Sequence, residues 1–121
     1  MNKKRIYLIV FLITFLAVTQ AKALDYQLPD INGQIHSFEQ YKGQWVIAHF
    51  WATWCRTCLK ELPDLIQNHN KNKESDIVVV GINFETIDNT RLKQFVNDKS
   101  IPFIVLNSEP VPKTPLGPVP A

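Results

Sequence analysis

The chain has 121 residues, of which 45% are hydrophobic and 20% are charged. This composition fits one small globular domain and excludes disorder as a general description of the chain. The formal net charge is +2 at pH 7, and its origin in the chain decides which partners it favours.

The first 23 residues have the three parts of a secretory signal peptide. A basic start at residues 3–5 precedes the apolar run Ile6–Val18, and the small-x-small sequence Ala21–Ala23 follows as a cleavage signal. This apolar run has thirteen residues, fewer than the roughly 20 that a membrane-spanning helix needs. We therefore expect cleavage after Ala23 and a domain over residues 24–121, with an uncleaved membrane anchor as the alternative.

Loss of this leader would remove four of the 13 basic residues and none of the 11 acidic ones, so the formal charge would change from +2 to −2. The basic character therefore belongs to targeting, and the mature chain gives no reason to expect nucleic acid as a partner. The expected location is periplasmic or otherwise exported. Such compartments are oxidising, and cysteines there normally form disulfides.

The first half of the domain predicts a hairpin, a strand and a helix, in that order. Residues 26–28 and 35–38 flank the turn signal Asn32-Gly33, which predicts a small β-hairpin. The dense apolar run over residues 44–51 predicts a buried strand. Leucines at helical spacing then predict a helix over residues 56–69.

The second half repeats this alternation. Residues 77–84 predict another buried strand, residues 88–99 a helix capped by Asp88 or Asn89, and residues 102–106 a third strand. Strands that alternate with helices imply a parallel sheet with right-handed crossovers. The fold class is therefore α/β.

The only two cysteines, Cys55 and Cys58, lie where the predicted strand meets the predicted helix. A bridge across so short a loop restricts the unfolded chain only modestly, so its purpose is better explained by chemistry than by stability. A helix N-terminus favours the thiolate form, which makes Cys55 the predicted nucleophile. Cys58, one turn inside the helix, is then placed to resolve a mixed disulfide.

The stretch Trp51–Cys58, followed by Glu61 and Pro63, resembles the WAxWCxxCxxExP signature of thioredoxin-like proteins, in particular the exported TlpA/ResA type. The resemblance extends over nearly all of residues 24–106. It implies a thioredoxin-like fold with three layers, a mixed central sheet and an N-terminal β-hairpin.

The same resemblance implies a protein-disulfide oxidoreductase that needs no cofactor, acts more often as a reductase and often serves cytochrome c maturation. Its expected partners are a protein that carries a disulfide or a thiol, and a membrane protein that recycles the cysteine pair. A complete chain would be a monomer. On residues alone, the sequence supports only a redox-capable CxxC in an exported α/β domain.

The resemblance also suggests roles for residues around the pair. Glu61 matches a family glutamate that could shuttle the proton of Cys58, the alternative being an ordinary solvated glutamate. Arg56 adds a cation that should favour the Cys55 thiolate. Thr57 stands where the family commonly has proline. The predicted substrate-binding residues are Trp54, Arg56, Thr57 and Pro120.

Two other uses of the pair are less favoured. A structural zinc site usually needs four ligands, and His36, His49 and His69 show no HxxxH or CxxH spacing. No metal site is therefore expected, and a metal-binding CxxC protein remains a minor alternative. Copper-delivery relatives use CxxxC, and peroxiredoxins carry threonine at the position of Ala52.

The end of the chain departs most from the family pattern. Residues 114–121 resemble the approach to the cis-proline that faces the CxxC, with Pro120 as the candidate, and the sequence stops one residue later. The strands and helix expected after that proline are missing, which would leave an open edge beside residues 45–51. The alternatives are a proline-rich linker for the tail and, for the whole chain, a non-catalytic truncated remnant.

Overall fold

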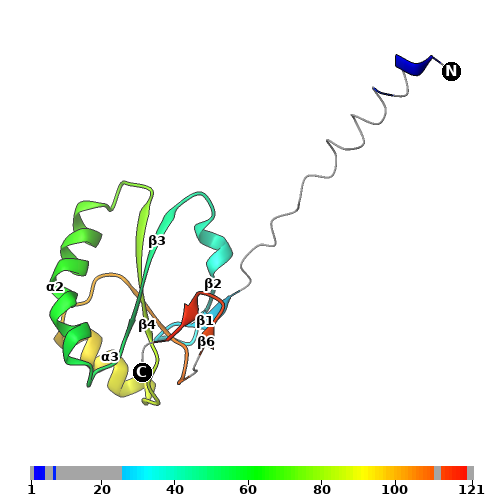
Figure 1. Cartoon of the computed structure of the whole chain (residues 1–121). Coiled ribbons are helices and arrows are strands. Elements are labelled where there is room, and N and C mark those ends of the chain that lie inside the picture. Colours follow the sequence, from blue (N-terminus) through cyan, green and yellow to red (C-terminus); the bar gives the residue numbers. More distant parts are fainter. Residues whose placement is uncertain (1, 5–6, 8–25, 111–112, 120–121) are drawn as a thin grey trace.

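The computed structural model describes residues 2–4, 7, 26–110 and 113–119 (Figure 1). Most of the predicted leader lies outside the described residues, as does Pro120. The cleavage site and the cis-proline therefore stay predictions. Within the part of the chain that is described, no helix combines the length and apolarity needed to cross a membrane.

A three-stranded parallel sheet forms the centre of the fold. Its strands are β3 (Trp45–Trp51), β4 (Ile77–Asn83) and β5 (Ile104–Asn107), in the spatial order β3-β4-β5. The register pairs Trp51 with Asn83, so all three carboxyl ends meet at one edge. The predicted strands are thus confirmed to within two residues at each end.

Both long helices, α2 (Arg56–Lys71) and α3 (Asn89–Asp98), lie on the same face of this sheet (Figure 1). Each one joins neighbouring parallel strands, and right-handed crossovers place consecutive helices of that kind on one side. Asp88 caps α3 by accepting hydrogen bonds from the backbone N–H groups of Thr90 and Arg91. A helix-side core joins the layers and consists of Trp51, Leu62, Val79, Leu92, Val96, Ile101, Phe103 and Val105.

The opposite face is covered by the predicted hairpin, β1 (Gln27–Pro29) and β2 (Ile35–Ser37), and by the short 3-10 helix η1 (Phe38–Tyr41). A second core there contains Leu28, Phe38, Val80, Ile82 and Leu106. An antiparallel bridge between Asp30 and Leu106 adds the hairpin to the β5 edge of the sheet. The three layers and the N-terminal hairpin are therefore confirmed, while the named strands of the central sheet are all parallel.

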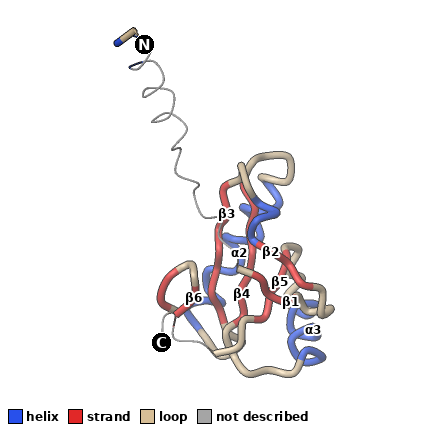
Figure 2. Tube along the Cα trace, turned by 90° about the vertical axis from the view of Figure 1, so that its right-hand side faces the viewer, coloured by secondary structure: helices blue, strands red, loops and turns tan. Residues whose placement is uncertain are grey.

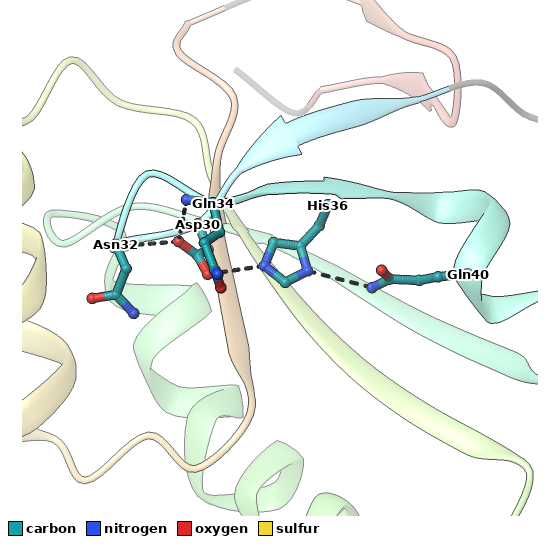
Figure 3. Close-up of polar contacts among 5 residues, drawn as sticks. All are labelled: Asp30, Asn32, Gln34, His36 and Gln40. Atoms are coloured by element: carbon teal, nitrogen blue, oxygen red, sulfur yellow. Dashed lines mark hydrogen bonds and ion pairs between the residues drawn. The ribbon is translucent and has the colours of Figure 1, made fainter.

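A buried carboxylate holds the turn of this hairpin. Asp30 accepts hydrogen bonds from the backbone N–H groups of Asn32 at 2.7 Å and Gln34 at 3.0 Å, and from His36 Nε2 at 2.9 Å (Figure 3). Gln40 lies 3.4 Å from the other ring nitrogen of His36. Burial raises the pKa of Asp30, but these hydrogen bonds outweigh burial and hold the pKa below its ordinary value.

The tail contains structure that the sequence did not predict. β6 (Lys113–Thr114) and β7 (Gly117–Pro118) form a two-stranded antiparallel hairpin, which Figure 2 shows apart from the central sheet. The Thr114 hydroxyl is buried and donates to the Gly117 carbonyl at 3.0 Å. The linker alternative is therefore wrong for these residues.

The expected open edge is present in the part of the chain that the structure describes. No described strand pairs with the outer side of β3. Trp45 and Ile47 on this strand are 78% and 38% exposed. Apolar edge strands of this kind are prone to pair with other chains.

Candidate functional site

The cysteine pair lies where β3 delivers the chain to the start of α2. Ala52, just after the strand, is fully buried and fixes the exit of the chain. Cys55 is the N-cap residue of α2, and Cys58 lies in its first turn. The two form a disulfide, with their Cα atoms 5.3 Å apart.

The helix N-terminus is directed at Cys55. The backbone N–H of Cys58 points at Cys55 Sγ, 3.3 Å away. Unpaired N–H groups and the partial positive charge of a helix start favour an anionic sulfur at this position. Arg56, the first residue of α2, is exposed and adds a cation next to it.

The two cysteines differ in their surroundings, although both are half-buried. Cys58 packs against the helix-side core, and its Sγ lies 3.7 Å from the backbone oxygen of Phe50. Cys55 belongs to neither core cluster. The roles of Cys55 as the accessible nucleophile and of Cys58 as the more internal resolving thiol stay predictions.

Three of the four predicted substrate-binding residues form an exposed rim beside the disulfide. Trp54 is 63% exposed, and its ring makes a T-shaped contact with the ring of Phe84, with 5.9 Å between the ring centroids. Arg56 and Thr57 are also exposed. Pro120 lies outside the described residues, and its role stays a prediction.

A set of hydrogen bonds that the sequence did not predict anchors the loop before Cys55. Glu85 accepts from the Thr53 backbone N–H at 2.9 Å, from the Thr53 hydroxyl at 3.0 Å and from Asn83 Nδ2 at 2.9 Å. Ser108 donates its backbone N–H to the Asn83 carbonyl at 2.9 Å. We call Thr53, Asn83, Glu85 and Ser108 the carboxyl-edge network.

Glu61, which the family pattern places near the Cys58 thiol, lies on α2. It faces His49, which the sequence suggested only as a possible metal ligand. Its Oε2 is 3.6 Å from His49 Nδ1, and the two side chains are 61% and 11% exposed. Burial lowers the pKa of His49, while the charge of Glu61 and the backbone of Cys58 act in the opposite direction. The overlooked signal was a histidine two residues before Trp51 in an apolar strand.

The described residues offer no obvious metal centre. Across residues 26–110 and 113–119, no three side chains among His, Cys, Asp and Glu come together closely enough to hold an ion. His36, His49 and His69 lie on separate elements or connections and contact different partners.

Comparison with known proteins places this geometry in a family. The AhpC/TSA family matches residues 19–110. The chain is 30% identical over 84 residues to the thiol-disulfide oxidoreductase ResA of Bacillus thuringiensis, covering 69% of this chain and 48% of ResA. It is 29% identical over 87 residues to the thioredoxin-like protein YneN of Bacillus subtilis, covering 70% and 51%. The chain thus spans about half the length of these curated relatives.

Solved structures agree with this placement. A secreted disulfide oxidoreductase of Mycobacterium tuberculosis, described as homologous to Escherichia coli DsbE, is similar with a TM-score of 0.62 and 25% identity. The match covers 72% of this chain and 63% of that one. The fold is thioredoxin-like, and the chain belongs to the AhpC/TSA family, within which it is of the TlpA/ResA type.

Proposed function

We propose that this chain is a thiol–disulfide oxidoreductase that works through Cys55 and Cys58. The observation that carries the proposal is the disulfide between the N-cap and the first turn of α2, at a helix start that favours a thiolate. The match to ResA, a thiol-disulfide oxidoreductase, supports it.

In the reducing direction, the Cys55 thiolate attacks one sulfur of a substrate disulfide. A Cys55–substrate S–S bond forms, the substrate S–S bond breaks, and the first substrate sulfur leaves as a thiolate that takes a proton. Cys58 then loses its proton and attacks Cys55 Sγ. The Cys55–Cys58 bond forms, the second substrate thiolate leaves, and two electrons have passed to the substrate.

Several finer features belong to the same proposal. Glu61 carries a carboxylate one helical turn beyond Cys58 and takes part in the proton exchange of that thiol. Trp54, Arg56 and Thr57 contact the substrate because they form the exposed rim beside the disulfide. The chain acts as an exported, periplasmic reductase on disulfide-containing proteins, in a role like that in cytochrome c maturation, and a membrane partner returns the pair to its dithiol form.

The test is dithiothreitol-dependent reduction of insulin by the purified chain, followed by turbidity. We expect turnover with the native sequence and none with Cys55→Ser. Thr90→Ala, at an exposed site on α3, is the control that should keep the native rate. Equal rates for the native chain and Cys55→Ser would overturn the proposal.

A second candidate, a non-catalytic domain, is favoured by the outer edge of β3, which pairs with no described strand and carries the exposed Trp45 and Ile47. It predicts a chain that aggregates or lacks a cooperative unfolding transition, and that shows no turnover even where the disulfide forms. A cooperative melt together with insulin reduction would reject it.

A further inference from the structure

One carboxylate of the carboxyl-edge network holds the loop between β3 and Cys55. Glu85 Oε1 accepts the backbone N–H of Thr53 at 2.9 Å, and Glu85 Oε2 accepts the Thr53 hydroxyl at 3.0 Å. Both oxygens of the carboxylate thus bind one residue, which lies two positions before Cys55 in the sequence. Because one bond comes from the backbone and the other from the side chain, they fix the direction of Thr53 as well as its place.

The carboxylate is itself attached to the central strand of the sheet. Glu85 Oε1 also accepts from Asn83 Nδ2 at 2.9 Å, and the Glu85 backbone N–H donates to Asn83 Oδ1 at 3.1 Å. Asn83 is the last residue of β4 and is fully buried. Ser108 donates its backbone N–H to the carbonyl of Asn83 at 2.9 Å. The sheet therefore sets the position of this carboxylate, and the loop takes its position from the carboxylate.

The loop that Glu85 holds is short. Residues 52–54 alone join the end of β3 to Cys55, the N-cap of α2. The Cys55 backbone N–H donates to the carbonyl of Ala52 at 3.1 Å, which closes a tight turn around Thr53. Ala52 is fully buried, and close packing leaves the turn little room to adjust. A displacement of Thr53 is therefore passed on to Cys55.

The position of Cys55 decides how strongly α2 acts on its sulfur. The Cys58 backbone N–H points at Cys55 Sγ from 3.3 Å, and the effect of a helix terminus falls off within its first turn. The helix favours a thiolate only while the sulfur faces the unpaired N–H groups of the helix start. In a loop free to move, the sulfur would turn toward water, and fewer molecules would carry the reactive thiolate.

We propose that Glu85 is a positioning residue for the nucleophile, which acts through Thr53 to hold Cys55 Sγ in front of the N-terminus of α2. This role rests on the proposed oxidoreductase function, because a thiolate at Cys55 matters where Cys55 attacks a disulfide. Glu85 lies 32 residues after Thr53, so the role depends on the packing of β4 beside β3 and not on the cysteine motif itself.

Positioning can be distinguished from a simple effect of charge, because the two act in opposite directions on the pKa of Cys55. A nearby negative charge disfavours a thiolate, so removing the charge of Glu85 alone would lower that pKa. Loss of the anchor on Thr53 withdraws the sulfur from the helix start, which raises the pKa. The direction of the change therefore identifies how Glu85 acts.

The experiment measures the thiol itself on the full chain. The reduced protein is alkylated with iodoacetamide at a series of pH values, and the modified peptides are quantified after digestion with trypsin. Cleavage after Arg56 separates Cys55 from Cys58, so each thiol gives its own pH profile, whose midpoint is its pKa. A native chain that fails to reduce insulin would count against the proposed function, whereas the midpoints of the variants test only the role of Glu85.

For Glu85→Ala we expect the Cys55 midpoint to rise by about half a pH unit, which slows alkylation below the midpoint about threefold. The control is Glu74→Ala, the same change at an exposed glutamate in the connection that enters β4, which should leave the midpoint unchanged. A lower midpoint in Glu85→Ala would show that Glu85 acts through its charge, and an unchanged one that it only supports the fold. Either result would overturn the proposal.

Substitutions at Thr53 give a second test that leaves every charge in place. Thr53→Val removes the hydroxyl bond to Glu85 and keeps the backbone bond, so the Cys55 midpoint should rise by less than in Glu85→Ala. Thr53→Ser keeps both bonds and should keep the native midpoint. A native midpoint in Thr53→Val, or an equal rise in both Thr53 variants, would contradict the assignment.

Discussion

Two histidine–carboxylate contacts lie on opposite faces of the same sheet, and they differ in which partner is buried. On the hairpin side, Asp30 is buried and receives three hydrogen bonds, with His36 Nε2 at 2.9 Å (Figure 3). On the helix side, the carboxylate of Glu61 is exposed and 3.6 Å from the buried His49.

The difference shows what each contact does. Every hydrogen bond of Asp30 fixes the chain between β1 and β2, so that contact is structural. Among the described residues, His49 Nε2 has no hydrogen-bond partner, and the backbone of Cys58 acts on the pKa of the ring. A satisfied polar cluster stabilises a fold, whereas an incompletely satisfied one beside a reactive group can serve chemistry.

The largest expected effect comes from removing the Cys58 thiol on the helix side of the sheet. In Cys58→Ser, a mixed disulfide at Cys55 has no intramolecular exit, so turnover should stop and a covalent complex with a disulfide substrate should accumulate. Non-reducing electrophoresis checks this. Accumulation with Cys55→Ser instead would reverse the roles of the two cysteines.

The next effect concerns stability on the hairpin side. Asp30→Ala leaves two backbone N–H groups and His36 without their acceptor, which should cost about 2 to 3 kcal/mol of unfolding free energy. Urea unfolding measures this loss. The rate of insulin reduction per folded molecule should stay native, because the hairpin lies on the face away from the cysteines. Slower insulin reduction by folded Asp30→Ala would contradict the division between the two faces.

Double-mutant cycles compare the two pairs directly. For Asp30 and His36 we expect a coupling energy of about 1 kcal/mol, since the carboxylate is buried and the hydrogen bond is short. For His49 and Glu61 the coupling should be at most about 0.5 kcal/mol, because water screens the exposed carboxylate. Equal couplings in urea unfolding would remove the distinction drawn between the pairs.

The smallest effects are two separate steps in the pH dependence of stability. The pKa of each group is lower in the folded protein, so the unfolded chain binds more protons and stability rises as the pH rises. The His49 contribution is complete above about pH 6.5 and is lost as pH falls toward its folded pKa. The Asp30 contribution is complete above about pH 3.9 and is lost below that.

Denaturant midpoints measured across this range should show both steps. His49→Asn should abolish the step at higher pH and Asp30→Asn the one at lower pH. If Asp30→Asn removed the higher step, the assignment of the two groups would be wrong.

The fold could be predicted largely from the sequence because its signals are local. Apolar runs and helical spacing predicted β3, α2, β4 and α3, and the CxxC motif from Cys55 to Cys58 spans only four residues. The Asn32-Gly33 signal likewise predicted the turn that Gly33 makes with a φ of +82°.

The surroundings of the cysteines could not be predicted, because they depend on contacts between elements. His49 meets Glu61 only when α2 packs on β3, and Thr53 meets Glu85 across 32 residues. The hairpin at residues 113–118 was missed because proline normally argues against strands, and only its antiparallel register reveals the pairing.

The carboxyl-edge network has a consequence for amide hydrogen exchange. The Thr53 amide lies in a loop, yet its proton is held by Glu85, which is bonded to Asn83 at the end of the central strand, where Ser108 is bonded as well. To release that proton, the loop must separate from the end of β4. The Thr53 amide should therefore exchange its hydrogen on the timescale of strand ends rather than of loops. The loop that precedes Cys55 is then expected to open as rarely as the end of the sheet.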